Sequence, residues 1–100
     1  MKLRYSGRAQ SDLNDVFRYL DERSPTGARN VMRAIYASIA FLAENPHASE
    51  ETNSAGVRVK IVNRYNFKIF YRISNDQIVE IIHVRHSARK TWVGENPGKL

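Results

Sequence analysis

Arginine, lysine and histidine side chains supply most of the chemistry that this sequence could perform, and they gather in its second half. Cleavage of RNA needs a base for the ribose 2′-hydroxyl, cations for the phosphorane-like transition state and an acid for the leaving oxygen. Arg58, Lys60, Arg72 and Arg85 could supply the cations, and His83 or His86 could transfer a proton near neutral pH. If the protein is a nuclease, its predicted catalytic groups are Arg58, Lys60, Arg72 and His86.

Positive charge is distributed unevenly along the 100 residues. Residues 1–56 carry seven Lys or Arg and seven Asp or Glu, whereas residues 57–100 carry nine and three, which accounts for the net charge of +6. The basic residues alternate with apolar ones in strand-like runs, so one face of a sheet should present them. Such a face favours an anionic partner, either nucleic acid or an acidic protein. The predicted target-binding residues are Arg58, Lys60, Lys68, Arg72, His83, Arg85, His86, Arg89 and Trp92.

Some of these residues also have a purely structural interpretation. Arg58 could pair with Glu80 on a neighbouring strand, a contact worth only ~0.2–1 kcal/mol. Phe70, which two cations flank, could stack on a base, anchor a protein partner or be covered by Trp92. His86 could simply be hydrogen-bonded at a strand end. We favour a recognition face because eight Lys or Arg of residues 57–90 are opposed by only two carboxylates.

Composition excludes several other kinds of site. The sequence contains no cysteine, which excludes disulfides and thiolate chemistry. His83 and His86 are three apart on a strand-like run and should point to opposite faces, so they are poor ligands for one metal. We predict no metal and no cofactor. No apolar run is typical of a signal peptide or a membrane span, so we expect a cytoplasmic protein with no membrane association.

Helical spacing predicts two helices that position the first half of the chain. Ser6 and Ser24 are placed as N-caps, and Pro25 suits the first position of the second helix. Asn45 should end that helix because proline follows it. The apolar stripes consist of Ala9, Leu13, Val16, Phe17 and Leu20, then Ala28, Val31, Met32, Ile35, Ile39 and Leu42. The short connection between the helices predicts an antiparallel hairpin.

Strands are predicted at residues 2–5, 57–62, 67–73 and 78–86, the last in a central position because it is apolar on both faces. Residues 47–56 are interpreted as a loop. The fold class is therefore α+β, with the helical hairpin packed on a small, mostly antiparallel sheet. The helices should cover the face that carries Val57, Val59, Ile61, Phe67, Ile69, Tyr71 and Ile73. The opposite face should carry Arg58, Lys60, Lys68, Phe70 and Arg72.

Five segments, in this order, resemble the ParE-type toxins of the RelE/ParE superfamily. They are residues 5–20, in which Ala9, Asp12, Leu13 and Tyr19 match the family pattern; 38–46, SIAFLAENP; 56–62, GVRVKIV, with a Gly-x-Arg; 65–73, YNFKIFYRI; and 81–92, IIHVRHSARKTW. The resemblance covers nearly the whole chain. It implies a single toxin domain over residues 1–100, with a loose tail at about 93–100.

The resemblance also implies a toxin of a type II toxin–antitoxin module, associated with plasmid stabilization and neutralised by a cognate ParD-like antitoxin. ParE-like members inhibit DNA gyrase, whereas RelE-like members cleave messenger RNA on the ribosome. RelE-like enzymes commonly complete their site with a Tyr just after the last strand, and residues 87–92 contain none. We therefore expect inhibition of growth through DNA gyrase, with a RelE-like ribosome-dependent endoribonuclease as the alternative. Protein docking is favoured over direct nucleic-acid binding.

Overall fold

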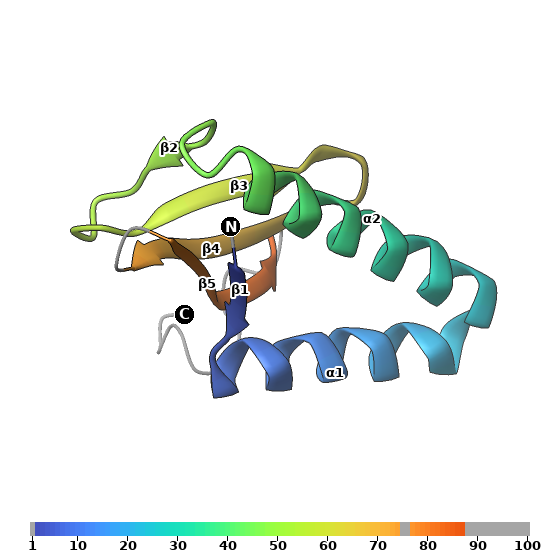
Figure 1. Ribbon diagram of the computed structural model, residues 1–100. Helices are drawn as coiled ribbons and strands as arrows, with labels where there is room; N and C mark the ends of the chain where they lie inside the picture. Colours follow the sequence, from blue (N-terminus) through green and yellow to red (C-terminus); the bar gives the residue numbers. More distant parts are fainter. Residues whose placement is uncertain (1, 75–76, 88–100) are drawn as a thin grey trace.

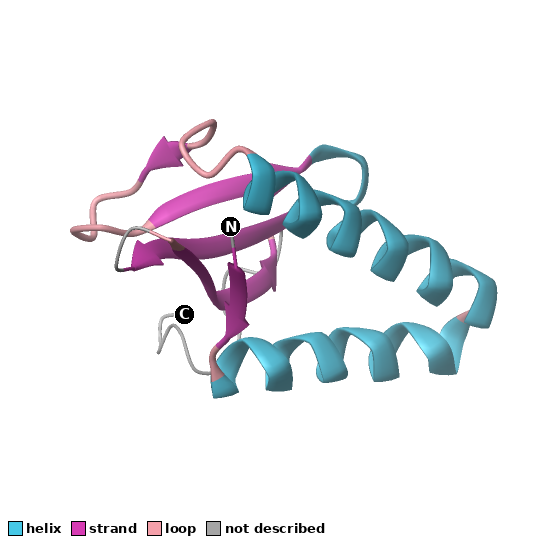
Figure 2. Cartoon of the chain, viewed as in Figure 1, coloured by secondary structure: helices cyan, strands magenta, loops and turns pink. Residues whose placement is uncertain are grey.

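The computed structural model describes residues 2–74 and 77–87, and its elements follow the predicted order (Figure 1). The elements are β1 (Lys2–Tyr5), α1 (Gly7–Arg23), α2 (Pro25–Glu44), β2 (Glu50–Glu51), β3 (Arg58–Val62), the 3-10 helix η1 (Asn63–Tyr65), β4 (Phe67–Ser74) and β5 (Ile78–His86). The two helices form a hairpin whose connecting turn extends beyond the sheet (Figure 2). The α+β prediction is confirmed.

Serine side chains begin both helices, as the sequence predicts. The backbone N–H of Ala9 donates to Ser6 Oγ at 3.0 Å, and that of Gly27 donates to Ser24 Oγ at 3.0 Å. Ser24 also ends α1, because its own N–H donates to the Leu20 carbonyl at 2.8 Å. One residue therefore terminates the first helix and caps the second, which fixes the short connection of the hairpin.

The strands form a five-stranded sheet in the order β1-β5-β4-β3-β2. β1 runs parallel to β5, and the other neighbouring pairs are antiparallel. β5 has a neighbour on each side, which confirms its predicted central position. The interpretation of residues 47–56 as loop alone is wrong, because Glu50 and Glu51 pair with Val59 and Arg58 as β2. Two consecutive glutamates give no apolar alternation that would indicate a strand.

The core lies between one face of the sheet and the hairpin. Ile35, Ile39 and Leu42 of α2 are at most 1% exposed, as are Ile69 and Tyr71 of β4. Three residues expected on the core side lie outside it: Phe17 is 43% exposed, Ile61 is 45% exposed, and Val59 pairs with Phe70 on the opposite face. Phe17 lies at the margin of the α1 stripe, and Ile61 lies on the face of β3 that turns away from the helices.

Candidate functional site

The predicted basic residues lie on two faces of the sheet, and the prediction of a single face is wrong. Residues paired across neighbouring strands share a face. Arg58 pairs with Tyr71 and Lys60 with Ile69, so both cations lie on the face that carries the core. The physical cause is the register of β3: Val62, opposite Phe67, is the buried residue, so period-two alternation places Lys60 and Arg58 on its side.

The opposite face of the sheet carries four of the predicted residues, Lys68, Arg72, His83 and Arg85, and we call it the outer basic face. β4 contributes Lys68 and Arg72, which pair with Arg85 and Glu80 of β5. The register of β1 adds Lys2 and Arg4, which neighbour Ile78 and Glu80. The outer basic face is defined by Lys2, Arg4, Lys68, Arg72, His83 and Arg85. Two carboxylates lie on this face of the described strands: Glu80 of β5, and Glu50 of β2, whose partner Val59 pairs with Phe70.

Lys2 and Arg4 are candidate functional residues that were not predicted from the sequence. Both side chains are exposed, and Arg4 Nε lies 3.8 Å from a Glu80 carboxylate oxygen. Nothing in the local pattern of residues 2–5 indicates that this strand pairs with a strand 76 positions later. The signal that could have found them is the rule that a strand leading into a helical crossover tends to run parallel to its neighbour.

An aromatic layer occupies the middle of the outer basic face. The rings of Phe70 and His83 are stacked, with centroids 5.4 Å apart and planes inclined by 17°. The guanidinium carbon of Arg85 lies 5.7 Å from the Phe70 ring centroid. The three side chains come from neighbouring strands, just before a register shift that leaves Ile82 between the partners of Phe70 and Tyr71. Such a bulge re-aims side chains locally.

Asp12 of α1 fixes the orientation of His83. The carboxylate is 5% exposed, and one of its oxygens accepts the Val84 backbone N–H at 2.9 Å. The same oxygen lies 2.8 Å from His83 Nδ1. A carboxylate oxygen accepts hydrogen bonds, so the contact is satisfied when the imidazole carries a proton on Nδ1. Asp12 therefore accepts a hydrogen bond from the backbone of β5 where β1 no longer pairs with it. The same carboxylate favours a proton on Nδ1 of His83.

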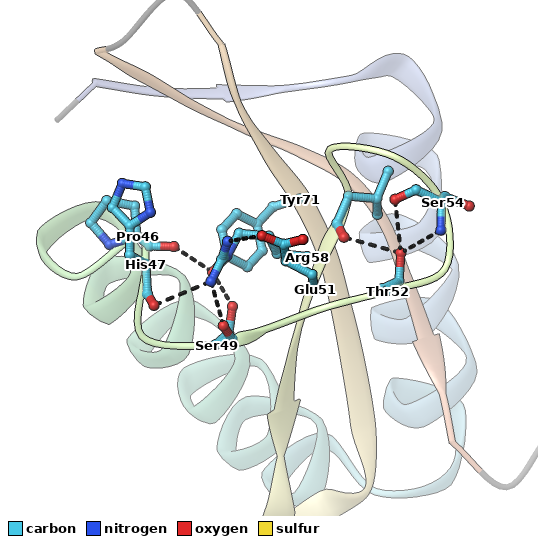
Figure 3. A network of polar contacts seen from close by, with 9 residues as sticks. Pro46, His47, Ser49, Glu51, Thr52, Ser54, Arg58 and Tyr71 are labelled. Atoms are coloured by element: carbon cyan, nitrogen blue, oxygen red, sulfur yellow. Dashed lines mark hydrogen bonds and ion pairs between the residues drawn. The ribbon is translucent and has the colours of Figure 1, made fainter.

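Arg58 is the centre of a separate polar network, shown in Figure 3. Its guanidinium donates to the carbonyls of His47 (3.2 Å) and Ser49 (2.6 Å) and to the carboxylate of Glu51 (3.2 Å). The Tyr71 hydroxyl donates to the Pro46 carbonyl at 2.7 Å and is also hydrogen-bonded to the Ser49 hydroxyl. The network fastens residues 46–51 to the sheet. The pairing of Arg58 with Glu80 that we considered is replaced by one with Glu51.

The four nuclease candidates are not assembled into one site. The Arg58 side chain is 17% exposed and occupied by the network. Lys60 lies with its ammonium 4.9 Å from the Phe41 ring of α2. His86 pairs with Phe67 on the core-carrying face, with ring centroids 5.0 Å apart, whereas Arg72 lies on the outer basic face. Arg89 and Trp92 lie outside the described residues.

An open groove between the helices is a second candidate surface. It comprises two adjoining clefts of about 470 and 330 Å³ that share Leu13, Asn14 and Tyr36. Phe17 and Tyr36 are 43% and 45% exposed. The groove is lined by Tyr5, Gln10, Leu13, Asn14, Phe17, Arg29, Met32, Arg33 and Tyr36. Burial, with a smaller contribution from Tyr36, raises the pKa of Tyr5 above its usual value of 10.0.

Among residues 2–74 and 77–87, no group of three or more potential metal-ligating His, Cys, Asp or Glu side chains is found. No helix in the same part of the chain has the length and apolar character needed to cross a membrane.

Three solved structures share this fold. A chain of the chromosomal ParDE system from P. aeruginosa superimposes with a TM-score of 0.75 at 20% identity, covering 86% of this chain and 95% of that one. The isolated E. coli RelE toxin gives 0.61 at 13% identity, covering 88% and 85%. The RelBE2 toxin–antitoxin complex of Mycobacterium tuberculosis gives 0.59 at 19% identity, covering 85% and 95%. At these identities the similarity concerns the fold alone.

Sequence comparison gives the family. The protein named "Putative toxin Y4kP" of Sinorhizobium fredii (strain NBRC 101917 / NGR234) is 30% identical over 91 residues, which are 91% of this chain and 92% of that protein. The family model described as the ParE toxin of the type II toxin–antitoxin system parDE matches residues 3–91. The chain belongs to the ParE family of type II toxin–antitoxin toxins.

Proposed function

We propose that this ParE-family toxin inhibits growth by poisoning DNA gyrase and that a ParD-like antitoxin neutralises it. The observation that supports gyrase over RNA cleavage is the dispersal of the four nuclease candidates. Arg58 is occupied by the loop network, Lys60 and His86 lie on the core-carrying face, and Arg72 lies opposite them. General acid–base cleavage requires these groups around one phosphate.

The outer basic face is the proposed target-binding surface. It presents five Lys or Arg side chains and the oriented His83 against two carboxylates of the described strands, Glu80 of β5 and Glu50 of β2. A surface with this excess of positive charge attracts an anionic target and accelerates association with it. Arg89 and Trp92, outside the described residues, remain predicted target-binding residues. Arg58, Lys60 and His86 lie on the other side of the sheet.

The target assignment is tested with two assays run in parallel on one preparation of the toxin. We expect the toxin to inhibit plasmid supercoiling by purified gyrase and to leave transcripts intact on translating ribosomes. Arg72→Gln should weaken gyrase inhibition, whereas Arg18→Gln, which removes the same charge from an exposed site on α1, should not. Cleaved transcripts together with unaffected gyrase would reassign the toxin to the ribosome-dependent nucleases.

The inter-helix groove is the proposed antitoxin-binding surface. Its apolar floor suits the apolar face of an amphipathic helix, and Arg29 and Arg33 suit acidic residues on the flanks of such a helix. The proposed antitoxin segment is therefore helical, amphipathic and acidic. Phe17 belongs to the apolar stripe of α1 but is exposed, and it is the residue that such a helix would cover.

Two aromatic residues of α1 provide a matched test of the groove. Phe17 and Tyr19 are each 43% exposed, but Phe17 lines the groove and Tyr19 does not. Phe17→Ser should weaken antitoxin binding by about 10-fold or more, and Tyr19→Ser should change it little. Isothermal titration with the protein encoded beside the toxin gene measures both. Equal losses would contradict the groove assignment.

A further inference from the structure

The outer basic face combines two features that proteins use together to hold single-stranded nucleic acid. Such proteins place cations along the backbone of the strand and aromatic rings against its bases. Lys68 and Arg72 stand on the same face of β4, four residues and hence about 13 Å apart. Phe70 lies midway between them, stacked on His83. A planar ring is thus flanked on both sides by positive charge.

We propose that the outer basic face binds a short stretch of single-stranded DNA, with a base stacked on Phe70 and His83 and phosphates contacted by Lys68, Arg72 and Arg4. The inference rests on the proposed function, because gyrase works on DNA, and it deepens that function by giving the toxin a direct contact with DNA. Protein docking, which the sequence favours, explains the cations but assigns no role to the stacked rings between them.

The surroundings of the rings support stacking over an incidental contact. Asp12 and the β-bulge hold His83 flat against Phe70, so the layer is ordered before a ligand arrives. The guanidinium carbon of Arg85 lies over the Phe70 ring, 5.7 Å from its centroid, and adds positive charge to the aromatic layer. The helices cover the opposite face of the sheet and do not obstruct this one (Figure 1). Bases in a duplex have their faces covered by stacking, so a single strand fits the layer better.

Direct binding to labelled oligonucleotides tests the proposal. A mixed-sequence 15-mer is prepared as single-stranded DNA, as duplex DNA and as RNA, and binding is followed by fluorescence anisotropy at several salt concentrations. We expect the single-stranded DNA to bind more tightly than the duplex. Arg72→Gln should lower the slope of log K against log salt by about 0.7, the value for one lost phosphate contact on a single strand.

Matched variants separate the stacking contribution from the charge contribution. Phe70→Leu keeps an apolar side chain but removes the ring, and we expect it to weaken binding about 5-fold or more without changing the salt slope. Phe41→Leu makes the same change at an exposed residue of α2, outside both proposed surfaces, and should have no effect. Arg18→Gln removes one charge from α1 and should leave the salt slope unchanged. Antitoxin binding and thermal unfolding verify that each variant is folded, and Lys68→Gln repeats the charge test.

Four outcomes would overturn the proposal: no binding by the wild-type toxin, equal effects of Arg72→Gln and Arg18→Gln, an unaffected Phe70→Leu variant, or tighter binding to RNA than to DNA. Supercoiling assays on the same proteins distinguish this failure from failure of the proposed function. If the toxin inhibits gyrase but binds no oligonucleotide, gyrase remains the proposed target and the proposed DNA contact is wrong. If the toxin binds DNA without inhibiting gyrase, the DNA contact stands and the proposed gyrase target is wrong.

Discussion

At the scale of single residues, Arg58 is occupied by its own chain. Its guanidinium makes hydrogen bonds to two backbone carbonyls and one carboxylate of residues 46–51. Arg58→Ala would leave those carbonyls without their hydrogen-bond donor. The Arg58 side chain is only 17% exposed in the wild type. We expect a loss of about 1–3 kcal/mol in the free energy of unfolding, measured by urea denaturation. Arg58→Lys should recover only part of it, because an ammonium lacks the planar fork.

Arg64→Gln is the control for this prediction, because Arg64 is an exposed residue of η1. It should leave the free energy of unfolding within about 0.5 kcal/mol of the wild type. An Arg58→Lys variant with unchanged stability and lost toxicity would contradict the structural role and return Arg58 to the target-binding set.

Asp12 supports a second prediction at the same scale. Its buried carboxylate accepts the Val84 N–H and holds His83, so Asp12→Ala would leave a buried backbone donor without an acceptor. We expect a cost of about 1–3 kcal/mol for alanine and a smaller cost for asparagine, whose amide oxygen can still accept one bond. Guanidinium denaturation gives the order wild type, Asp12→Asn, Asp12→Ala. Equal stability of the two variants would show that the Val84 contact contributes little.

At the scale of elements, the helices were predictable and the register of β3 was not. Serine caps, a proline at the first helical position and apolar stripes are local signals, and the structure realises them at Ser6 and Ser24. In β3, apolar residues alternate with Arg58 and Lys60, yet the one buried residue is Val62. Which set faces the core depends on pairing with β4 and on the Arg58 network, and neither is visible within β3.

Ser24 carries a prediction about the hairpin. Ser24→Ala removes the cap of α2 but keeps the backbone N–H that ends α1, so only one of its two roles is lost. We expect a decrease of about 1 kcal/mol in the free energy of unfolding, and Ser24→Asp should restore most of it because aspartate is also an effective N-cap. Thermal unfolding of the three proteins measures the effect. A destabilised Ser24→Asp would contradict the capping explanation.

Tyr5, where β1 meets the helices, predicts a dependence on alkaline pH. Its folded-state pKa is raised above 10.0 by burial and by Tyr36. The unfolded chain therefore releases this proton at a lower pH than the folded protein does. The stabilisation is fully present below pH 10 and is lost as the pH rises through the folded pKa. Tyr5→Phe should reduce the loss of stability above pH 10, followed by urea denaturation across pH 8–11. If Tyr5→Phe and the wild type lost stability identically as the pH rises, this prediction would be contradicted.

At the scale of the whole molecule, the sequence indicated the charge excess correctly but not its position. Five of the nine Lys and Arg of residues 57–100 lie on strands of the sheet: Arg58, Lys60, Lys68, Arg72 and Arg85. The basic surface differs from the predicted one in two ways. β1 adds Lys2 and Arg4 through its parallel pairing with β5, and Arg58 and Lys60 lie on the face that carries the core. Composition is a property of the chain, whereas the charge on each face of a sheet depends on how distant strands pair. The location of this surface therefore required the folded structure.

The two proposed surfaces lie on different parts of this architecture, which leads to a prediction of independence. The groove is formed mainly by α1 and α2, and the outer basic face by the side of the sheet that turns away from those helices. Arg72→Gln should weaken gyrase inhibition and leave antitoxin affinity unchanged, whereas Phe17→Ser should do the reverse. Because the substituted residues share no contact, effects in the double variant should add to within about 0.3–0.5 kcal/mol. Titration of the antitoxin and supercoiling assays on the four proteins measure this coupling. A larger coupling energy would mean that one partner reaches both surfaces, so that the antitoxin neutralises the toxin by covering the outer basic face itself.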